Sequence, residues 1–479
     1  MNTLDKFFKM TARGTNLRTE LLAGATTFFA MSYIMIVNPV ILSSAGMDPE
    51  AVYVATILAS VAGTLFMAFI ANVPYALAPG MGMNSFFAST LCLGMGFTWQ
   101  ESLAMVFICG LIGVAITTTK LRKELIISIP QFMQNGIGGA LGFFITYIGL
   151  KSAGFLSFIV PPGSYSLFPD GTIITDSSPV PALVNFTQKG ALLALIGLFV
   201  MVFLVVRGVK GAVLLGVLIT TALGVPMGIV TLPASLFGAG HLSSLRKTAF
   251  AAFSDEGIIR LFSGRHSFGM ITVAMLTLLL TDIFDSTGSF IATGRMAGLY
   301  RNFFQDDDRA AQEVSAPRFS STMDKALFAD LLATATGAVL GTSNVTTYLE
   351  STTGIAAGGR TGLTVIFTAL FMLLCLPLSA IAAAIPAQAT APALIIVGVL
   401  MTGSFRKINW DHFEEAFPTF ITVAAMSFAY SITTGMAFGF ISYTLIMIFK
   451  GKTKQISPAV LAITALFAVN YVLRAHAEI

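Results

Sequence analysis

Long apolar runs, each close to the thickness of a lipid bilayer, follow one another along most of the chain. They are continuous rather than alternating, and about 20 apolar residues suffice to cross a membrane as a helix. Because lipid admits only helices and closed barrels, the pattern predicts an all-α polytopic membrane protein. The predicted spans of the first half are residues 21–42, 51–70, 74–91, 102–119, 131–150, 191–206 and 211–230. Those of the second half are residues 270–299, 326–340, 342–359, 363–385, 390–401, 416–432 and 436–449, followed by an extra hydrophobic segment at 456–474.

Two sets of seven spans place the second half upside down relative to the first, which is the arrangement of inverted-repeat transporters. Short sequence echoes occur at matching places in the two halves. Asn72-Val73 is echoed by Asn344-Val345, and Ile129-Pro130-Gln131 by Ile385-Pro386-Ala387-Gln388. The echoes predict that spans 3 and 10 correspond, as do the regions that lead into spans 5 and 12.

Spans 3 and 10 cannot be continuous helices. The first contains Pro74, Pro79, Gly80 and Gly82, and the second is rich in β-branched and hydroxyl residues between positions 343 and 354. Each segment predicts a short extended piece that leads into a half-helix. Unwound backbone at membrane depth is tolerated where it lines a cavity or is buried in protein, and free N–H groups of a half-helix can face a ligand.

Composition and charge agree with a membrane protein: 55% of residues are hydrophobic and 10% are charged. The net charge of +4 is modest and reflects topology rather than nucleic-acid binding. Lys6, Lys9, Arg13 and Arg18 precede the first span and predict a cytoplasmic N-terminus. Most of the basic loops fit this orientation. The loop at 233–267 departs from it with four basic residues: Arg246, Lys247, Arg260 and Arg265.

Acidic residues deep in the spans are the strongest candidates for function, because a carboxylate near the bilayer centre costs at least about 2.5 kcal/mol. Asp282, Asp285 and Glu350 are predicted to lie deep, whereas Asp330 and Glu20 are predicted to lie at span edges. No Lys or Arg falls at the middle of a run, so protonation, water or a hydrogen-bond-donating ligand must neutralise the deep acids. For Asp282, helix packing is the alternative role.

Enzymatic chemistry finds no support in the sequence. The four histidines, His241, His266, His412 and His476, fall in predicted loops or the tail, and the three cysteines have no metal-binding spacing. Phosphate-binding and dinucleotide-binding motifs are absent from the sequence, as is a nucleophile elbow. We therefore expect a transporter driven by an ion gradient, with neither a metal nor a cofactor.

Four motifs carry a family resemblance that extends over about residues 14–470: Asn38-Pro39, Ala78-Pro-Gly-Met-Gly-Met-Asn84, Asp282-Ile-Phe-Asp-Ser-Thr-Gly288 and the run from Glu350 to Gly362. The sequence resembles the nucleobase–cation symporter-2 family, in its adenine/guanine/hypoxanthine permease branch. The resemblance implies 14 spans in two inverted repeats of seven, with short antiparallel strands in spans 3 and 10. It implies a core domain (14–123 and 268–385) that moves as an elevator against a gate domain (124–232 and 386–450). Many members of the wider fold are dimers, so a homodimer in the cell membrane is expected.

The resemblance also implies the site residues. Substrate binding is implied for Asp285, Glu350, Tyr348, Asn84, Ala78, Thr352 and Ile34. Proton coupling is assigned to Glu350, Asp285 or Asp282. Ser289 and Phe290 depart from the usual pattern of the branch, which leaves the substrate range open.

The expected function is import of a purine base by proton symport, with sodium as the alternative ion. A carboxylate accepts two parallel N–H bonds, which suits the edge of a nucleobase. A permease for xanthine or uracil and an anion transporter of the sulfate-permease fold are the alternatives.

Overall fold

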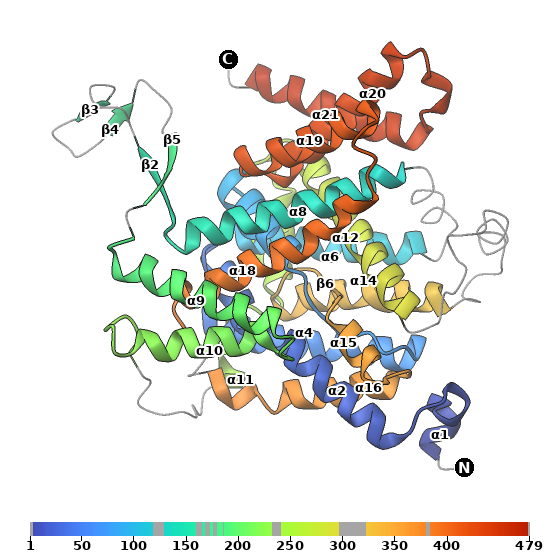
Figure 1. Cartoon of the computed structure of the whole chain (residues 1–479). Helices are drawn as coiled ribbons and strands as arrows, with labels where there is room; N and C mark the ends of the chain where they lie inside the picture. The colour runs from blue at the N-terminus through green and yellow to red at the C-terminus, as the bar shows by residue number, and fades with distance from the viewer. Residues whose placement is uncertain are drawn as a thin grey trace.

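The computed structural model describes residues 3–117, 129–159, 165–167, 173–175, 180–184, 186–231, 241–296, 322–379 and 384–477. Several predicted cytoplasmic charges lie outside these residues, namely Lys120, Arg122, Lys123 and the run Asp306–Arg309. Six helical segments of the described part are long and apolar enough to cross a membrane. Together with shorter apolar helices and two broken spans, they confirm the predicted all-α polytopic fold (Figure 1).

The first half contains seven consecutive membrane segments. They are α2 (Leu17–Met31) with α3 (Ile34–Ser43), α4 (Pro49–Phe66) with the π-helix η2 (Met67–Ala71), β1 (Leu77–Pro79) with α5 (Met81–Ser85) and the π-helix η3 (Phe86–Gly94), α6 (Trp99–Thr117), α8 (Gln131–Ser152), α9 (Lys189–Val206) and α10 (Ala212–Gly224). The first span, predicted as one run, is interrupted at Ser32 and Tyr33 and begins earlier than predicted. The interruption lacks the Pro or Gly that would have marked it in the sequence.

The second half repeats this order. Its segments are α12 (Phe268–Met296), α14 (Thr322–Leu340), β6 (Val345–Thr347) with α15 (Ser351–Ala356), α16 (Gly362–Leu373) with η7 (Leu376–Leu378), α18 (Ala387–Met401) with η8 (Thr402–Lys407), α19 (Phe413–Phe428) and α20 (Ile432–Phe449). The remaining elements are α1 (Thr3–Phe8), η1 (Thr11–Arg13), β2 (Leu156–Ile159), β3 (Tyr165–Leu167), β4 (Ile173–Thr175), β5 (Val180–Leu183), α11 (His241–Ser244), η4 (Leu245–Lys247), η5 (Ala251–Phe253), η6 (Asp255–Ile259), η9 (Thr453–Gln455) and α21 (Pro458–Ala477).

Strands β1 and β6 join the two halves at the centre of the bundle. They pair antiparallel, with Leu77 opposite Thr347 and Pro79 opposite Val345, which confirms the predicted strands of spans 3 and 10. All six strand residues are buried. Pairing satisfies backbone groups that would be costly to leave unbonded in an apolar interior.

Proline marks a second correspondence between the halves. Pro130 precedes α8 and Pro386 precedes α18, each as the N-cap residue of its helix. These are the residues of the Ile-Pro echo, and the two helices pack against one another. The match places spans 5 and 12 in equivalent positions of the two repeats.

The helices pack in two groups. In one, α14 packs against α4 and α6, and α16 packs against α2. In the other, α18 packs against α8, α9 and α10, and α19 packs against α8 and α20. Strands β1 and β6 lie in the first group, since both contact α4 and α14.

The segment 241–266, which departs from the charge rule, covers the ends of several helices on one face. Its basic residues lie near acids of that face: the Lys247 ammonium pairs with the Asp48 carboxylate, and Arg260 Nε lies 3.9 Å from Glu101 Oε1. The Phe250 N–H donates to the Val339 carbonyl at 2.7 Å. Two of the four unexpected positive charges are thus compensated locally, which accounts for part of the departure.

The C-terminal helix α21 packs against α20 and α12. The Thr444 and Thr464 hydroxyls are 2.9 Å apart, and the rings of Phe440 and Phe467 are 6.2 Å apart. These pairs, taken in order from the connecting loop, show that α21 runs antiparallel to α20. Figure 1 shows the C-terminus at the end of α21 remote from that loop.

Candidate functional site

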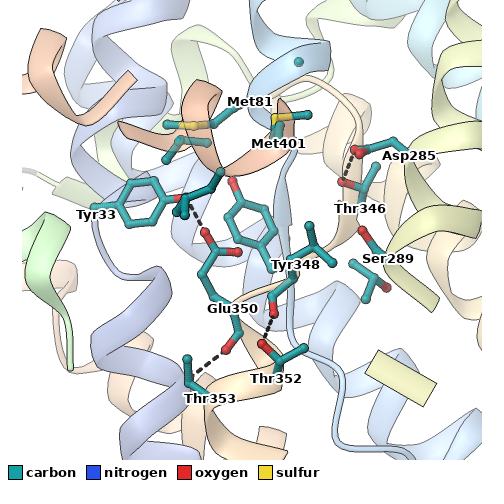
Figure 2. Close-up of a pocket in the computed structure, with 16 residues that line it drawn as sticks. Tyr33, Met81, Asp285, Ser289, Thr346, Tyr348, Glu350, Thr352, Thr353 and Met401 are labelled. Atoms are coloured by element: carbon teal, nitrogen blue, oxygen red, sulfur yellow. Dashed lines mark hydrogen bonds between the residues drawn. The ribbon is translucent and has the colours of Figure 1, made fainter. Parts of the chain in front are cut away.

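A cavity of about 280 Å³ lies where the first span is interrupted and spans 3 and 10 are broken. It is lined by Tyr33, Gly80, Met81, Gly82, Asp285, Ser289, Thr346, Thr347, Tyr348, Leu349, Glu350, Thr352, Thr353, Val397, Leu400 and Met401. Both helix groups contribute, because the last three residues come from α18. Figure 2 shows Glu350 beside Tyr33, Asp285 beside Thr346, and Tyr348 between the two acids.

Glu350 reaches the cavity because the chain turns sharply after β6. It is the N-cap residue of α15, and its Oε1 accepts a hydrogen bond from the Tyr33 hydroxyl at 2.6 Å. Tyr33 lies at the interruption of the first span, so its side chain can point across to span 10. One carboxylate oxygen is therefore held by the protein while the other remains available to a ligand.

The half-helix α15 differs from the prediction that its first N–H groups face a ligand. The N–H groups of Ser351, Thr352 and Thr353 donate to the carbonyls of Tyr348, Leu349 and Glu350 at 3.1, 2.9 and 3.0 Å. A tight turn places those carbonyls within reach and consumes the donors. At this end of the cavity the side chains supply the polar chemistry.

Asp285 comes from α12 and stands next to the strand pair. The Thr346 hydroxyl donates to Asp285 Oδ2 at 3.5 Å, a long bond. Gly80 opens the space beside this carboxylate, since a Cβ at that position would lie 2.7 Å from Thr346 Oγ1 and 3.5 Å from Asp285 Oδ2. The backbone of Gly80 is extended, with φ −71° and ψ 128°, a conformation that other residues also adopt. The glycine is therefore needed because it leaves room beside the carboxylate, not because of its backbone angles.

Tyr348 separates the two acids and is itself fixed. Its hydroxyl donates to the Pro79 carbonyl at 2.6 Å, which ties span 10 to span 3 next to the strand pair. On the other helix group, Val397, Leu400 and Met401 form an apolar wall. The cavity thus offers carboxylates and an aromatic ring on one side and aliphatic surface on the other, which suits a flat polar ring.

Four of the residues predicted for substrate binding line the cavity: Asp285, Glu350, Tyr348 and Thr352. Ile34, Ala78 and Asn84 do not, and neither does the predicted coupling residue Asp282. Ile34 is fully buried next to Tyr33, which lines the cavity in its place. Ala78 pairs with Thr346 in the strand ladder.

Asn84 holds span 3 to span 10. Its Oδ1 accepts a hydrogen bond from the Ser343 hydroxyl, and its side chain is fully buried on α5. Asp282 lies one helical turn before Asp285 and is buried away from the cavity. Phe290 is also buried, with its ring centre 5.7 Å from that of Tyr75, whereas its neighbour Ser289 lines the cavity.

Asp330 corrects the prediction that it lies at a span edge, because α14 begins at Thr322 and the residue is fully buried near the middle of that helix. Glu20 lies in the first turn of α2, at the edge of its span as predicted, and is also fully buried. Asp330 Oδ1 accepts hydrogen bonds from the N–H and the hydroxyl of Thr347, both at 3.0 Å, and its Oδ2 accepts one from Ser286. Glu20 accepts bonds from the Arg360 N–H and from the Thr364 hydroxyl. Both carboxylates connect parts of the fold.

Comparison with known proteins assigns the family. Residues 18–438 match the family model named Xan_ur_permease and described as "Permease family". The chain belongs to this permease family. The permease is 37% identical over 470 residues to the adenine permease AdeP of Escherichia coli, covering 98% of this chain and 96% of that protein. It is also 37% identical over 469 residues to the guanine/hypoxanthine permease PbuO of Bacillus subtilis, covering 97% and 99%.

The fold of the permease has solved relatives. The transmembrane domain of the cyanobacterial bicarbonate transporter BicA superposes with a TM-score of 0.57 at 16% identity, covering 88% of this chain and 97% of that one. At this identity the likeness concerns the fold alone. Family and fold together make the permease a multi-pass membrane transporter and not an enzyme.

Proposed function

We propose that the permease imports purine bases (adenine, guanine, hypoxanthine or a close relative) by proton symport. The observation that carries the proposal is that Asp285 and Glu350, from different spans, line one cavity with Tyr33 and Tyr348. Relatives that are named as adenine and guanine/hypoxanthine permeases support it, because they align over nearly their whole length. At about 280 Å³, the cavity falls just below the range of about 300–1,000 Å³ typical of drug-sized ligands, as a single base requires.

The cavity matches the chemistry of a purine. A purine presents N–H donors along its edges, and a carboxylate is a strong, directional acceptor for them. Tyr33 occupies Glu350 Oε1, so Oε2 and the Asp285 carboxylate are the acceptors for base edges. Stacking on the Tyr348 ring would add about 1–3 kcal/mol, as for bases stacked on aromatic residues.

Coupling to protons follows from the charges around the base. Among the described residues that line the cavity, none is Lys, Arg or His, so neither acid has a cationic partner there. A carboxylate in this position is best neutralised by a proton or by the base. Asp285 or Glu350 therefore carries the coupled proton, with Asp282, one turn away, as the further candidate.

Transport requires the cavity to reach both faces of the membrane in turn. Spans 1–4 and 8–11 carry the acids, and α18 of the other helix group carries the apolar wall. Movement of the first group past the second, as an elevator, would carry a base bound to the acids along that wall. The chain would act in the cell membrane with its N-terminus in the cytoplasm.

The test is uptake of radiolabelled adenine, guanine, hypoxanthine, xanthine and uracil into proteoliposomes. An inward proton gradient should drive purine accumulation, and a collapsed gradient or a sodium gradient alone should not. Accumulation driven by a sodium gradient would show that sodium, and not the proton, is the coupled ion. Accumulation of uracil or xanthine alone would show that the substrate is that base and not adenine, guanine or hypoxanthine. Folded protein that takes up none of the bases would overturn the proposal.

Anion transport, the function named for the fold relative BicA, finds no support at the site. An anion would meet two carboxyl groups, and the described lining offers no basic side chain to oppose them.

A further inference from the structure

The short link between α19 and α20 contains a tyrosine in an unusual backbone conformation. Tyr430 has φ 51°, in the left-handed region. Its N–H donates to the Ser427 carbonyl at 3.3 Å, and the next N–H, of Ser431, donates to the Met426 carbonyl at 3.1 Å. This bond pattern ends a helix with a position that glycine usually fills, because glycine has no Cβ. A bulky aromatic residue in such a position points to a use for its side chain.

The side chain of Tyr430 meets the outer part of α8. Its ring centre lies 5.6 Å from that of Phe144 and 6.0 Å from that of Tyr147. The Lys151 ammonium lies 4.6 Å from the centre of the Tyr430 ring, within the distance of a cation–π interaction. These contacts hold the tyrosine within the helix group that contains α8, α19 and α20.

The same residue also touches the other helix group. The Ser89 hydroxyl donates to the Tyr430 hydroxyl at 3.4 Å, and the Ile432 N–H donates to the Thr90 hydroxyl at 3.5 Å. Ser89 and Thr90 belong to η3, the continuation of span 3. Tyr430 therefore bridges the two groups whose relative movement the proposed function requires.

The bridge lies on one side of the cavity. Met81 and Gly82 of α5 line the cavity, and Ser89 follows seven residues later, about 10 Å farther along the helix. Lys151 lies in the last turn of α8, just before the β2–β5 hairpin, which projects from one end of the bundle in Figure 1. The cavity residue Met401 is the last residue of α18, whereas the hairpin end of α8 packs against an earlier part of α18, since a Cβ at Gly149 would lie 2.8 Å from Ile395. The Tyr430 contacts thus lie between the cavity and the membrane face that carries the β2–β5 hairpin, called the hairpin side below, and close the route from the cavity to that face.

We propose that Tyr430 is a latch that closes the hairpin side in this conformation and must release before the cavity opens there. The inference rests on the proposed function in one respect: it assigns the released state to the step at which a base enters. Tyr430 does not line the cavity, so it is a positioning residue whose loss changes the balance of conformations. A latch that favours the closed state lowers the fraction of transporter ready to bind from the hairpin side, and it raises the apparent KM accordingly.

Labelling from the hairpin side tests the latch directly. With the proposed cytoplasmic N-terminus, the five spans before the hairpin place this side outside the cell. A reporter cysteine, Val397→Cys, is introduced after Cys92, Cys109 and Cys375 are replaced by alanine, and intact cells are treated with a membrane-impermeant maleimide. Tyr430→Gly and Tyr430→Asn suit the left-handed backbone and remove the ring. Both should label at least about threefold faster than the parent, and in the otherwise native chain both should lower the KM for base uptake by a similar factor. Tyr430→Phe, which loses the bond to Ser89 alone, should fall between.

The matched control is Phe250→Gly. Phe250 is likewise an aromatic residue with a left-handed backbone, φ 61°. Its ring contacts Phe253 and its N–H donates to the Val339 carbonyl, on a segment that packs against α4, α6 and α14. Its replacement should change neither labelling nor KM. Unchanged labelling in both Tyr430→Gly and Tyr430→Asn would overturn the latch. Labelling needs no substrate, so failure of base uptake by the native chain would sink the proposed function and leave this test intact.

Discussion

Acids inside the helix bundle of this permease differ in how their oxygens are used: Asp330 is fully buried, whereas Asp285 and Glu350 are partly exposed at the cavity. Asp330 accepts three hydrogen bonds from Thr347 and Ser286 and is not among the residues that line the cavity. Glu350 accepts one from Tyr33, Asp285 accepts a long one from Thr346, and both line the cavity. Burial alone therefore does not identify a binding carboxylate. An acid inside the bundle that has spare acceptor capacity toward a cavity is prepared for a ligand, and one surrounded by hydrogen-bond donors stabilises the fold.

The largest effect is expected for the cavity acids. Glu350→Gln and Asp285→Asn keep the shape of each side chain but remove its charge and replace an acceptor with a donor. Because hydrogen bonds to charged groups contribute about 1.5–3 kcal/mol, purine uptake should fall by at least about 10- to 100-fold in each variant. The measurement is initial uptake at matched protein amounts.

The folded amount of these two variants, judged by size-exclusion chromatography in detergent, should match that of the native chain. Their unfolding temperatures should match as well. Full uptake by both variants would show that the cavity acids do not bind the base.

Asp330 should show the opposite pattern. Asp330→Ala leaves the N–H and hydroxyl of Thr347 and the hydroxyl of Ser286 without their acceptor, and each buried unpaired group costs about 1–3 kcal/mol. We expect a clearly lower unfolding temperature and less folded protein, with Asp330→Asn in between. If Asp330→Asn unfolded like the native chain but lost uptake as Glu350→Gln does, the distinction between Asp330 and the cavity acids would fail.

A smaller effect is expected from filling the space beside Asp285. Gly80→Ala would place a methyl group 2.7 Å from Thr346 Oγ1 and 3.5 Å from Asp285 Oδ2, in a backbone conformation that alanine accepts. The KM for the base should rise several-fold, about tenfold at most. The unfolding temperature should fall modestly, because buried Thr346 must shift to accommodate the methyl group. Gly403→Ala is the matched control because nothing lies within 4 Å of its added methyl group. Equal KM values for the two variants would remove Gly80 from the site.

The smallest effect belongs to an acid outside the spans. Partial burial works against ionisation of Asp48, but hydrogen bonds from Lys247 and from the Ala51 N–H outweigh it and hold the pKa of Asp48 below its usual 3.8. A carboxyl with a lowered pKa contributes stability above its ordinary pKa, and this stability is lost as pH falls through the folded-state value. The contribution should be below about 1 kcal/mol, because Lys247 is largely exposed.

Asp48→Asn keeps an N-cap side chain and removes the charge. Unfolding temperatures of the two proteins should therefore differ slightly at pH 7 and converge as the pH approaches 3. A constant difference across that range would exclude the ion pair as its cause.

The broad fold and part of the site could be predicted because their signals are local. Apolar runs mark spans, and proline and glycine mark the break in span 3. The deep acids Asp285 and Glu350 stand out from an apolar background, and the motifs around them carry the family resemblance. The extended pieces of spans 3 and 10 were predictable from their breaker and β-branched residues, whereas their antiparallel arrangement was implied by the family resemblance.

Other features depend on packing that the sequence does not display. The interruption at Tyr33 has no breaker residue, and Val397, Leu400 and Met401 are ordinary apolar residues that become a cavity wall through the position of α18. Asp330 looked peripheral because the apolar run around it is short. Its depth is set by contacts with Thr347 and Ser286 across two other spans. Each of these three features depends on which helices pack against one another, and the sequence alone does not show that packing.

The pairing of β1 with β6 constrains the order in which the protein can be completed during synthesis. Leu77–Pro79 emerges from the ribosome about 270 residues before its partner strand Val345–Thr347. At about 5–20 residues per second, the delay is roughly a quarter of a minute to a minute. Throughout that interval the growing chain carries β1 without the strand that satisfies its backbone groups. Another protein or trapped water must shelter it, so the half-made permease is the stage at which an insertion chaperone would matter most.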